Sequence, residues 1–155
     1  MTPAILTARR ARIAFEVLDY PHDPAAVSYG LEAAEKLQLP PEQVFKTLVI
    51  QLDGSELVVA LVPVQHQLDL KALARQAGCK KAQLADAALV ERVTGYVLGG
   101  VSPLGQKKLL RTLIDQSARQ FAQIYVSAGR RGLELQVAPA DLAACCRAEF
   151  RPLAR

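Results

Sequence analysis

Residues 44–64 read VFKTLVIQLDGSELVVALVPV and carry the strongest local fold signal in the chain. Two runs rich in β-branched and other aliphatic residues, 44–51 and 56–63, are joined through Asp53-Gly54. Asp-Gly favours a tight turn because both residues tolerate the left-handed backbone that such turns require. The sequence therefore predicts an antiparallel β-hairpin.

Short helices and further strands are predicted on both sides of this hairpin. Each expected helix follows a capping residue or has proline in its first position. The expected helices are 3–12, 29–38, 70–77, 87–93 and 139–147, and the expected strands are 13–20, 109–115, 124–127 and 133–138. This mixture of hairpins and short helices predicts an α/β (mixed α+β) fold with a mixed sheet.

The chain has 155 residues, of which 51% are hydrophobic and 22% charged. This length fits a single domain, residues 1–155, which buries roughly two-thirds of its unfolded surface without needing disulfides. No apolar run approaches the ~18 residues that span a bilayer, and the first residues do not resemble a secretory signal. We expect a soluble, cytoplasmic domain without contact to a membrane.

Cysteine and histidine are scarce. The three cysteines are Cys79, Cys145 and Cys146, and the two histidines are His22 and His66. Their number and spacing match neither a disulfide framework nor a zinc site. We expect free thiols in a reducing compartment, with no metal and no cofactor.

Lys46 is the sharpest local anomaly. Side chains alternate along a strand, so Lys46 shares a face with Val44, Leu48 and Ile50. A desolvated ammonium group is costly, which favours a wet pocket, an acidic partner or an anionic ligand for this lysine. The alternative is that Lys46 lies near the strand start and extends its amine into solvent.

Two glycine-containing segments are further candidates. Residues 95–105, GYVLGGVSPLG, are the most glycine-dense stretch, and residues 127–132, SAGRRG, place small residues beside two arginines. Such segments let the backbone approach a ligand and direct amides at its oxygens, but ordinary turns use the same residues. Neither matches a dinucleotide-binding or Walker motif.

No protein nucleophile is evident. There is no Gly-x-Ser-x-Gly motif, and no cysteine has a histidine near it in sequence. His22 beside Asp23 fits a local hydrogen-bonding motif better than a catalytic base with its orienting acid. If the chain is an enzyme, catalysis is expected to come from positioning and electrostatics.

The formal net charge is +4, and basic residues occur in local pairs. These pairs are consistent with a solvated surface or with contacts to a phosphate-rich partner.

Four segments together resemble the YbaK family of trans-editing proteins. They are VFKTL at 44–48, VPV at 62–64 followed by QLDLK at 67–71, TGYVLGGVSPLGQKK at 94–108, and IYVSAGRRGL at 124–133. The resemblance runs nearly from end to end. It implies a compact α/β domain around a mixed, partly barrel-like sheet.

The resemblance also implies site residues. The family's essential lysine falls on Lys46, and we expect Lys46, Gly99 and Gly100 to be catalytic. The family has an acid after the Gly-Leu pair, commonly aspartate, where this chain has Glu134. Expected substrate-binding residues are Tyr20, Tyr29, Thr47, Val101, Ser102, Ser127 and Glu134, and expected contacts to the tRNA backbone are Lys80, Lys81, Lys107, Lys108, Arg130 and Arg131.

The implied activity is hydrolytic removal of cysteine from mischarged Cys-tRNA(Pro), beside prolyl-tRNA synthetase. In the mechanism proposed for the family, the thiol of the substrate cysteine attacks the ester and releases the tRNA. Two alternatives remain open. The chain can be a deacylase that uses water to remove alanine or another small residue, or a non-catalytic module that binds nucleotides or the synthetase.

Overall fold

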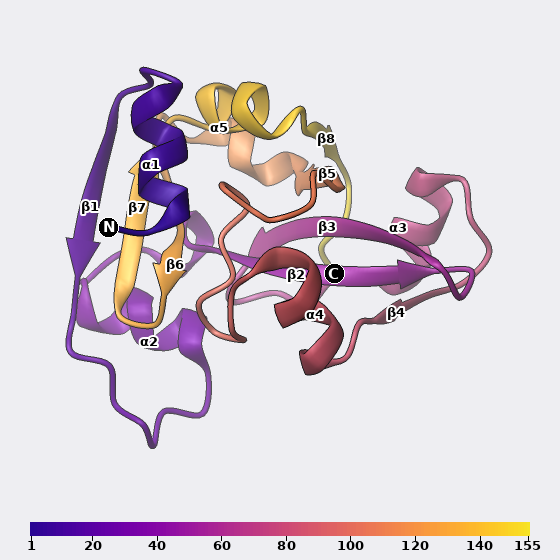
Figure 1. The fold of residues 1–155 in the computed structure, drawn as a ribbon, viewed down its shortest axis with the longest axis horizontal. Helices are drawn as coiled ribbons and strands as arrows, with labels where there is room; N and C mark the ends of the chain where they lie inside the picture. Colours follow the sequence, from indigo (N-terminus) through magenta and orange to yellow (C-terminus); the bar gives the residue numbers. More distant parts are fainter.

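The computed structural model describes residues 1–155 and confirms the predicted hairpin. Strands β2 (Phe45–Leu52) and β3 (Glu56–Pro63) pair antiparallel from Phe45 opposite Pro63 to Leu52 opposite Glu56. They form the centre of a five-stranded sheet, in the order β4-β2-β3-β5-β8 (Figure 1). Strands β5 (Arg111–Asp115) and β8 (Glu149–Arg151) extend it in parallel, and β4 (Ala82–Leu84) extends it antiparallel.

A second sheet has three antiparallel strands in the order β1-β7-β6. These are β1 (Phe15–Asp19), β7 (Leu133–Val137) and β6 (Ile124–Arg130). An isolated bridge between Val44 and Tyr125 links the two sheets, and neither sheet closes into a barrel. The α/β class and the single compact domain are therefore confirmed, with two open sheets in place of one partly barrel-like sheet.

The main core lies between the two sheets. It contains Phe45 and Val49 from β2, Leu61 from β3, and Val126 and Leu135 from the second sheet. A smaller core covers the opposite face of the five-stranded sheet, beneath helix α3 (Leu70–Ala77). Residues on both faces of β2 and β3 are buried, which explains their nearly continuous apolar sequence.

The helices begin where the capping residues predict. Side-chain oxygens of Thr2, Ser28, Asp69 and Asp86 accept hydrogen bonds from backbone amides in the first turns of four helices. These helices are α1 (Pro3–Arg10), α2 (Tyr29–Lys36), α3 and α4 (Ala87–Thr94), and α5 (Pro139–Cys146) begins with proline. The sequence analysis extended α1 and α2 two residues beyond their observed ends at Arg10 and Lys36.

Two further details differ from the sequence analysis. The short strands β4 and β8 and the 3-10 helices η1 (Pro41–Gln43) and η2 (Gln116–Gln120) were not predicted. Strand β6 continues to Arg130 through an irregularity between Ser127 and Arg130, so part of the expected turn at 127–132 is strand. None of the helices combines the length and the apolar character that a membrane-spanning segment needs.

Candidate active site

A cavity of about 350 Å³ lies where the start of β2 meets the second sheet, the beginning of α2 and the glycine loop. Eight of the ten predicted catalytic and substrate-binding residues line it: Tyr20, Tyr29, Lys46, Thr47, Gly99, Val101, Ser127 and Glu134. They come from segments far apart in the sequence. A larger open groove of about 750 Å³, beside Arg119 and Phe150, contains none of the predicted residues.

Lys46 lies at the start of β2 and lines this cavity. The Lys46 side chain is half-buried, and its amine forms no ion pair and no hydrogen bond within the chain. Burial lowers the pKa of the Lys46 amine, because desolvation disfavours its charged form. The amine is thus placed at a cavity without an acidic partner of its own, which makes it available to an anionic ligand.

Glu134 lies on β7, the central strand of the second sheet, and its register partners are Leu18 and Ser127. It lines the cavity although its residue is only 6% exposed, and no hydrogen bond or ion pair is made by its carboxyl group. Burial raises the pKa of Glu134 to about 8. At neutral pH the empty site therefore holds mainly the protonated, uncharged acid.

Tyr20 follows β1 and lies close enough to Glu134 to be influenced by its charge. Burial, followed by the charges of Glu134 and Glu32, raises the pKa of Tyr20 to about 12. The phenol is therefore a hydrogen-bond donor at any physiological pH. Thr47 and Ser127 are among the other hydroxyl-bearing residues that line the cavity. The buried Oγ1 of Thr47 has no partner in the chain, and Oγ of Ser127 accepts from the amide of Gly129 at 3.2 Å.

Tyr29 and Gly99 form one wall of the cavity. A Cβ atom at Gly99 would lie 2.7 Å from the Tyr29 ring, and the φ angle of +85° at Gly99 is one that favours glycine. The guanidinium group of Arg131 lies 4.6 Å from the centroid of the same ring, and Nε of Arg131 donates to the carbonyl oxygen of Leu98 at 2.8 Å. The glycine loop, α2 and the β6–β7 hairpin are thereby held together.

Gly100 and Ser102 do not line the cavity. A Cβ atom at Gly100 would lie 2.8 Å from the Cα atom of Arg130, and the amide of Gly100 donates to the carbonyl oxygen of Val97 at 2.9 Å. Ser102 is fully buried, and its hydroxyl accepts from the amide of Leu104. Of the loop residues that do line the cavity, the amides of Gly99 and Val101 donate to no group in the chain.

A buried carboxylate behind the cavity wall was not predicted. Oε1 of Glu32 contacts Nδ1 of His22 at 2.7 Å, while Oε2 accepts from the amide of Asp23 at 2.7 Å and from Nζ of Lys36 at 2.9 Å. Burial alone would raise the pKa of Glu32, but these donors outweigh it and lower the pKa to about 2. His22 thus belongs to a local hydrogen-bonding motif, as expected, although its partner is Glu32 rather than Asp23.

This carboxylate connects the segment before α2 to the helix itself. The segment carries Val27 and Ser28, which line the cavity. The only sequence signal was the spacing of Glu32 and Lys36, which places the two charges on neighbouring turns of a helix.

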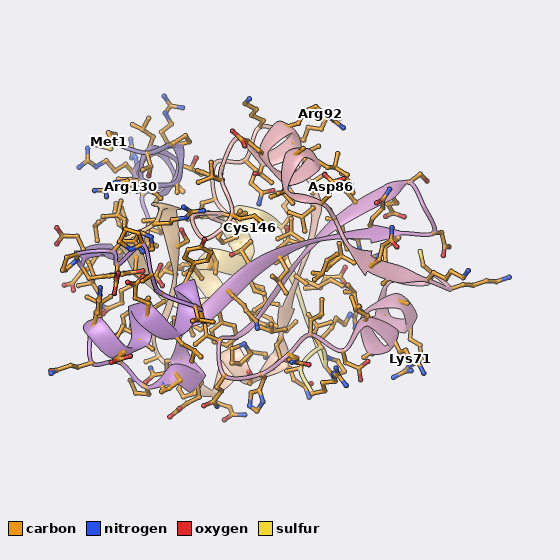
Figure 2. The ribbon with its side chains drawn as sticks, turned by 90° about the horizontal axis from the view of Figure 1, so that it is seen from below. Met1, Lys71, Asp86, Arg92, Arg130 and Cys146 are labelled. Carbon is orange, nitrogen blue, oxygen red and sulfur yellow. The ribbon has the colours of Figure 1, made fainter.

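The predicted basic residues divide among three regions. Arg130 and Arg131 lie beside the glycine loop, next to the cavity. Lys80 and Lys81, here called the turn lysines, donate backbone amides to Oδ1 of Asp53 at the other end of β2. Asp53 lies seven positions after Lys46 along the chain, roughly 23 Å at about 3.3 Å per residue. Figure 2 shows Arg130 and Lys71, which lines the same hollow as the turn lysines, on opposite sides of the molecule.

Lys107 and Lys108 lie in a third position, after the glycine loop. Their amides donate to the carbonyl oxygens of Thr94 and Val93 at 3.1 Å, and the stem of Lys107 packs against Gly95. They do not line the cavity.

These features define a small α/β domain with one polar cavity that contains an amine, a carboxyl group and hydroxyl groups but neither cysteine nor histidine. The chain belongs to the aminoacyl-tRNA editing domain family, whose model matches residues 23–145. The predicted resemblance and the predicted class of enzyme, one that edits aminoacyl-tRNA by hydrolysis, are thereby confirmed.

Individual relatives agree with this assignment. The chain is 38% identical over 117 residues to an Enterococcus faecalis protein named "Putative Cys-tRNA(Pro)/Cys-tRNA(Cys) deacylase EbsC", covering 76% of this chain and 71% of the relative. It is 36% identical over 91 residues to the proline–tRNA ligase of Geobacter metallireducens, covering 58% of this chain and 16% of the ligase.

A solved structure described as "a putative trans-editing enzyme for prolyl tRNA synthetase" superposes with a TM-score of 0.83 at 22% identity, covering 100% of this chain and 99% of the other. This similarity shows the shared fold.

Proposed function

We propose that this chain is a trans-acting deacylase that removes cysteine from mischarged Cys-tRNA(Pro). Family membership and the similarity to the Enterococcus relative support the substrate class. The structural observation that carries the proposal is the cavity itself. It collects Lys46, two unengaged loop amides and hydroxyl groups, and it contains no cysteine or histidine that could form a covalent intermediate.

In the proposed reaction the substrate supplies the nucleophile. The sulfur of the cysteinyl group attacks its own ester carbonyl, the bond from the carbonyl carbon to the ribose oxygen breaks, and the thiol proton ends on that oxygen. The product is free tRNA and a cyclic thioester, which water later opens to cysteine. Intramolecular attack in a well-held geometry can contribute about 7–11 kcal/mol.

The roles of the cavity groups follow from the charge that develops. The carbonyl oxygen becomes negative during attack, so donors fixed around it lower the barrier. Lys46 is proposed to hold this charge or the oxygens of the terminal nucleotide, and the amides of Gly99 and Val101 are proposed as further donors. Losing one such donor costs about 2.7–4 kcal/mol, which is a factor of about 100 to 1,000 in rate.

The partners proposed are the acceptor end of tRNA(Pro) and prolyl-tRNA synthetase. Arg130 and Arg131 lie beside the cavity and are proposed to contact phosphates near the charged end, whereas the turn lysines are proposed to contact RNA farther away. A domain of this size is not expected to read the anticodon as well, so the synthetase is proposed to supply tRNA identity. Deacylation that does not respond to added synthetase would count against this part of the proposal.

The proposed substrate is tested by comparing deacylation of Cys-tRNA(Pro), Ala-tRNA(Pro) and Ser-tRNA(Pro) under identical conditions. Attack by the substrate thiol predicts fast release of cysteine and almost none of alanine or serine. Release of alanine at a comparable rate would show that water attacks. Binding of all three without release of any would make the chain a non-catalytic module.

A further inference from the structure

The carboxyl group of Glu134 has no interaction partner within the folded chain. It accepts no hydrogen bond, forms no ion pair and caps no helix, although its residue is only 6% exposed. It sits on β7, the central strand of the three-stranded sheet, and lines the cavity. Burying a carboxyl group without a partner is unfavourable, which makes a partner supplied by a ligand the natural explanation.

The cavity separates its charged groups. Its titratable side chains are Tyr20, Tyr29, Lys46 and Glu134. Lys46 is on β2 of the five-stranded sheet, and Glu134 is on β7 of the three-stranded sheet. The two form no ion pair, and the amine does not contribute to the perturbation of the Glu134 carboxyl. The cavity therefore offers a basic group and an acidic group at separate places, as a ligand with opposite polarity at its two ends would require.

We infer that Glu134 binds the free α-amino group of the aminoacyl ester, while Lys46 faces its nucleotide end. This inference rests on the proposed function only for the identity of the ligand as an aminoacyl ester. An α-ammonium group is a cation with several N–H donors, and a carboxylate is its strongest acceptor among side chains, so binding of the ammonium group would draw Glu134 into its ionised form. Binding in this direction would fix which way the amino acid points relative to the glycine loop.

A contact between Glu134 and the α-amino group would make the site selective for esters with an unmodified amine. An N-acylated aminoacyl ester, such as a peptidyl ester, carries no positive charge at that position. It would leave the carboxyl group unpaired, and the buried site would lose the interaction that compensates its desolvation. The enzyme would thus spare peptidyl-tRNA while acting on aminoacyl-tRNA.

The selectivity for a free α-amino group can be tested by measuring binding of ligands that the protein cannot cleave. The probes are 3′-cysteinylamido-3′-deoxyadenosine 5′-phosphate, whose amide resists cleavage, and the same molecule acetylated on its α-amino group. Wild-type protein should bind the free-amine probe at least tenfold more tightly by titration calorimetry. Glu134→Gln should bind both probes equally, Glu134→Asp should keep part of the preference, and Glu16→Gln, which removes an exposed carboxylate from β1, should behave as wild type.

Equal affinity of the wild-type protein for the two probes would overturn the inference, as would an unchanged preference in Glu134→Gln. A circular dichroism spectrum of each variant checks that it is folded. The proposed function is judged separately by deacylation of Cys-tRNA(Pro). If the amine preference is found but no cysteine is released, the assignment of Glu134 stands and the proposed reaction falls. If cysteine is released without any preference for the free amine, the proposed reaction stands and the assignment of Glu134 falls.

Discussion

Replacing Glu134 by glutamine should stabilise the fold and change its dependence on pH. Burial raises the pKa of this carboxyl from 4.5 to about 8 in the folded chain. A raised pKa means that the folded state binds the proton more tightly than the unfolded state does. The carboxyl therefore favours folding most below pH 4.5, and its contribution declines as the pH rises towards 8 and is then constant.

The size of the effect follows from the shift. Each pKa unit corresponds to about 1.4 kcal/mol, so between pH 4.5 and pH 7 the wild-type protein should lose about 3 kcal/mol of stability through this one group. Glutamine does not titrate and has no such loss. The free energy of unfolding of Glu134→Gln, relative to wild type, should therefore rise by about 3 kcal/mol over this range.

Urea unfolding of both proteins at half-unit steps from pH 4.5 to 8.5 measures this difference. Groups that titrate alike in both proteins cancel in the comparison, and Tyr20, the residue coupled to Glu134, titrates far above this range. Glu16→Gln, which removes an exposed carboxylate from β1, is the matched control for the loss of a carboxyl group. A Glu134→Gln difference that changes by less than about 0.5 kcal/mol between pH 5 and pH 8 would refute the reasoning, because it would mean that the carboxyl is well solvated or paired.

Three further predictions concern the loop residue Gly99, the buried Glu32 and the turn lysines. Gly99→Ala should lower kcat/KM at least tenfold, because the new Cβ atom would meet the Tyr29 ring at 2.7 Å. Gly54 has a similar φ of +86° but no atom within 4 Å of the position of a Cβ, so Gly54→Ala should leave kcat/KM unchanged. Glu32→Gln should lower the melting temperature at pH 7, while Glu35→Gln, exposed on the same helix, should not. Because the pKa of Glu32 is lowered to about 2, its stabilisation is present above pH 4.5 and lost as the pH falls towards 2, so the two melting temperatures should converge there. Replacing both turn lysines by alanine should reduce the salt dependence of tRNA binding by about one unit of slope per lost phosphate contact, without affecting cleavage of a short aminoacylated oligonucleotide.

The parts of the fold that local chemistry decides were predictable. The hairpin turn at Asp53-Gly54 and the caps at Ser28, Asp69 and Asp86 are set by residues within a few positions of each other. Strands β4 and β8 have only three residues each, and they are extended because they pair with β2 and β5. Pairing between distant segments leaves no periodic pattern in so short a stretch, so the sequence could not reveal them.

The residues of the candidate site likewise fall into those that the sequence indicated and those that only the folded structure reveals. Lys46 was conspicuous because a charged residue interrupts an aliphatic row, and the family resemblance located Tyr20, Ser127 and Glu134. The buried Glu32 and its contacts depend on how the segment before α2 folds back, which local patterns do not specify. Gly100 was expected at the ligand because glycines permit close approach, and the structure shows that the group approaching it is the backbone of Arg130.

The central claim is that Lys46 drives cleavage of a mischarged aminoacyl-tRNA in this cavity. A single-turnover time course with Cys-tRNA(Pro) tests it, using wild type, Lys46→Ala and the control Lys71→Ala. Lys71 does not line the cavity and lies on the opposite side of the molecule from Arg130 (Figure 2). The expected result is that Lys46→Ala releases cysteine about 100 to 1,000 times more slowly while keeping its fold, and that Lys71→Ala matches wild type. Release by Lys46→Ala at the wild-type rate would contradict the account.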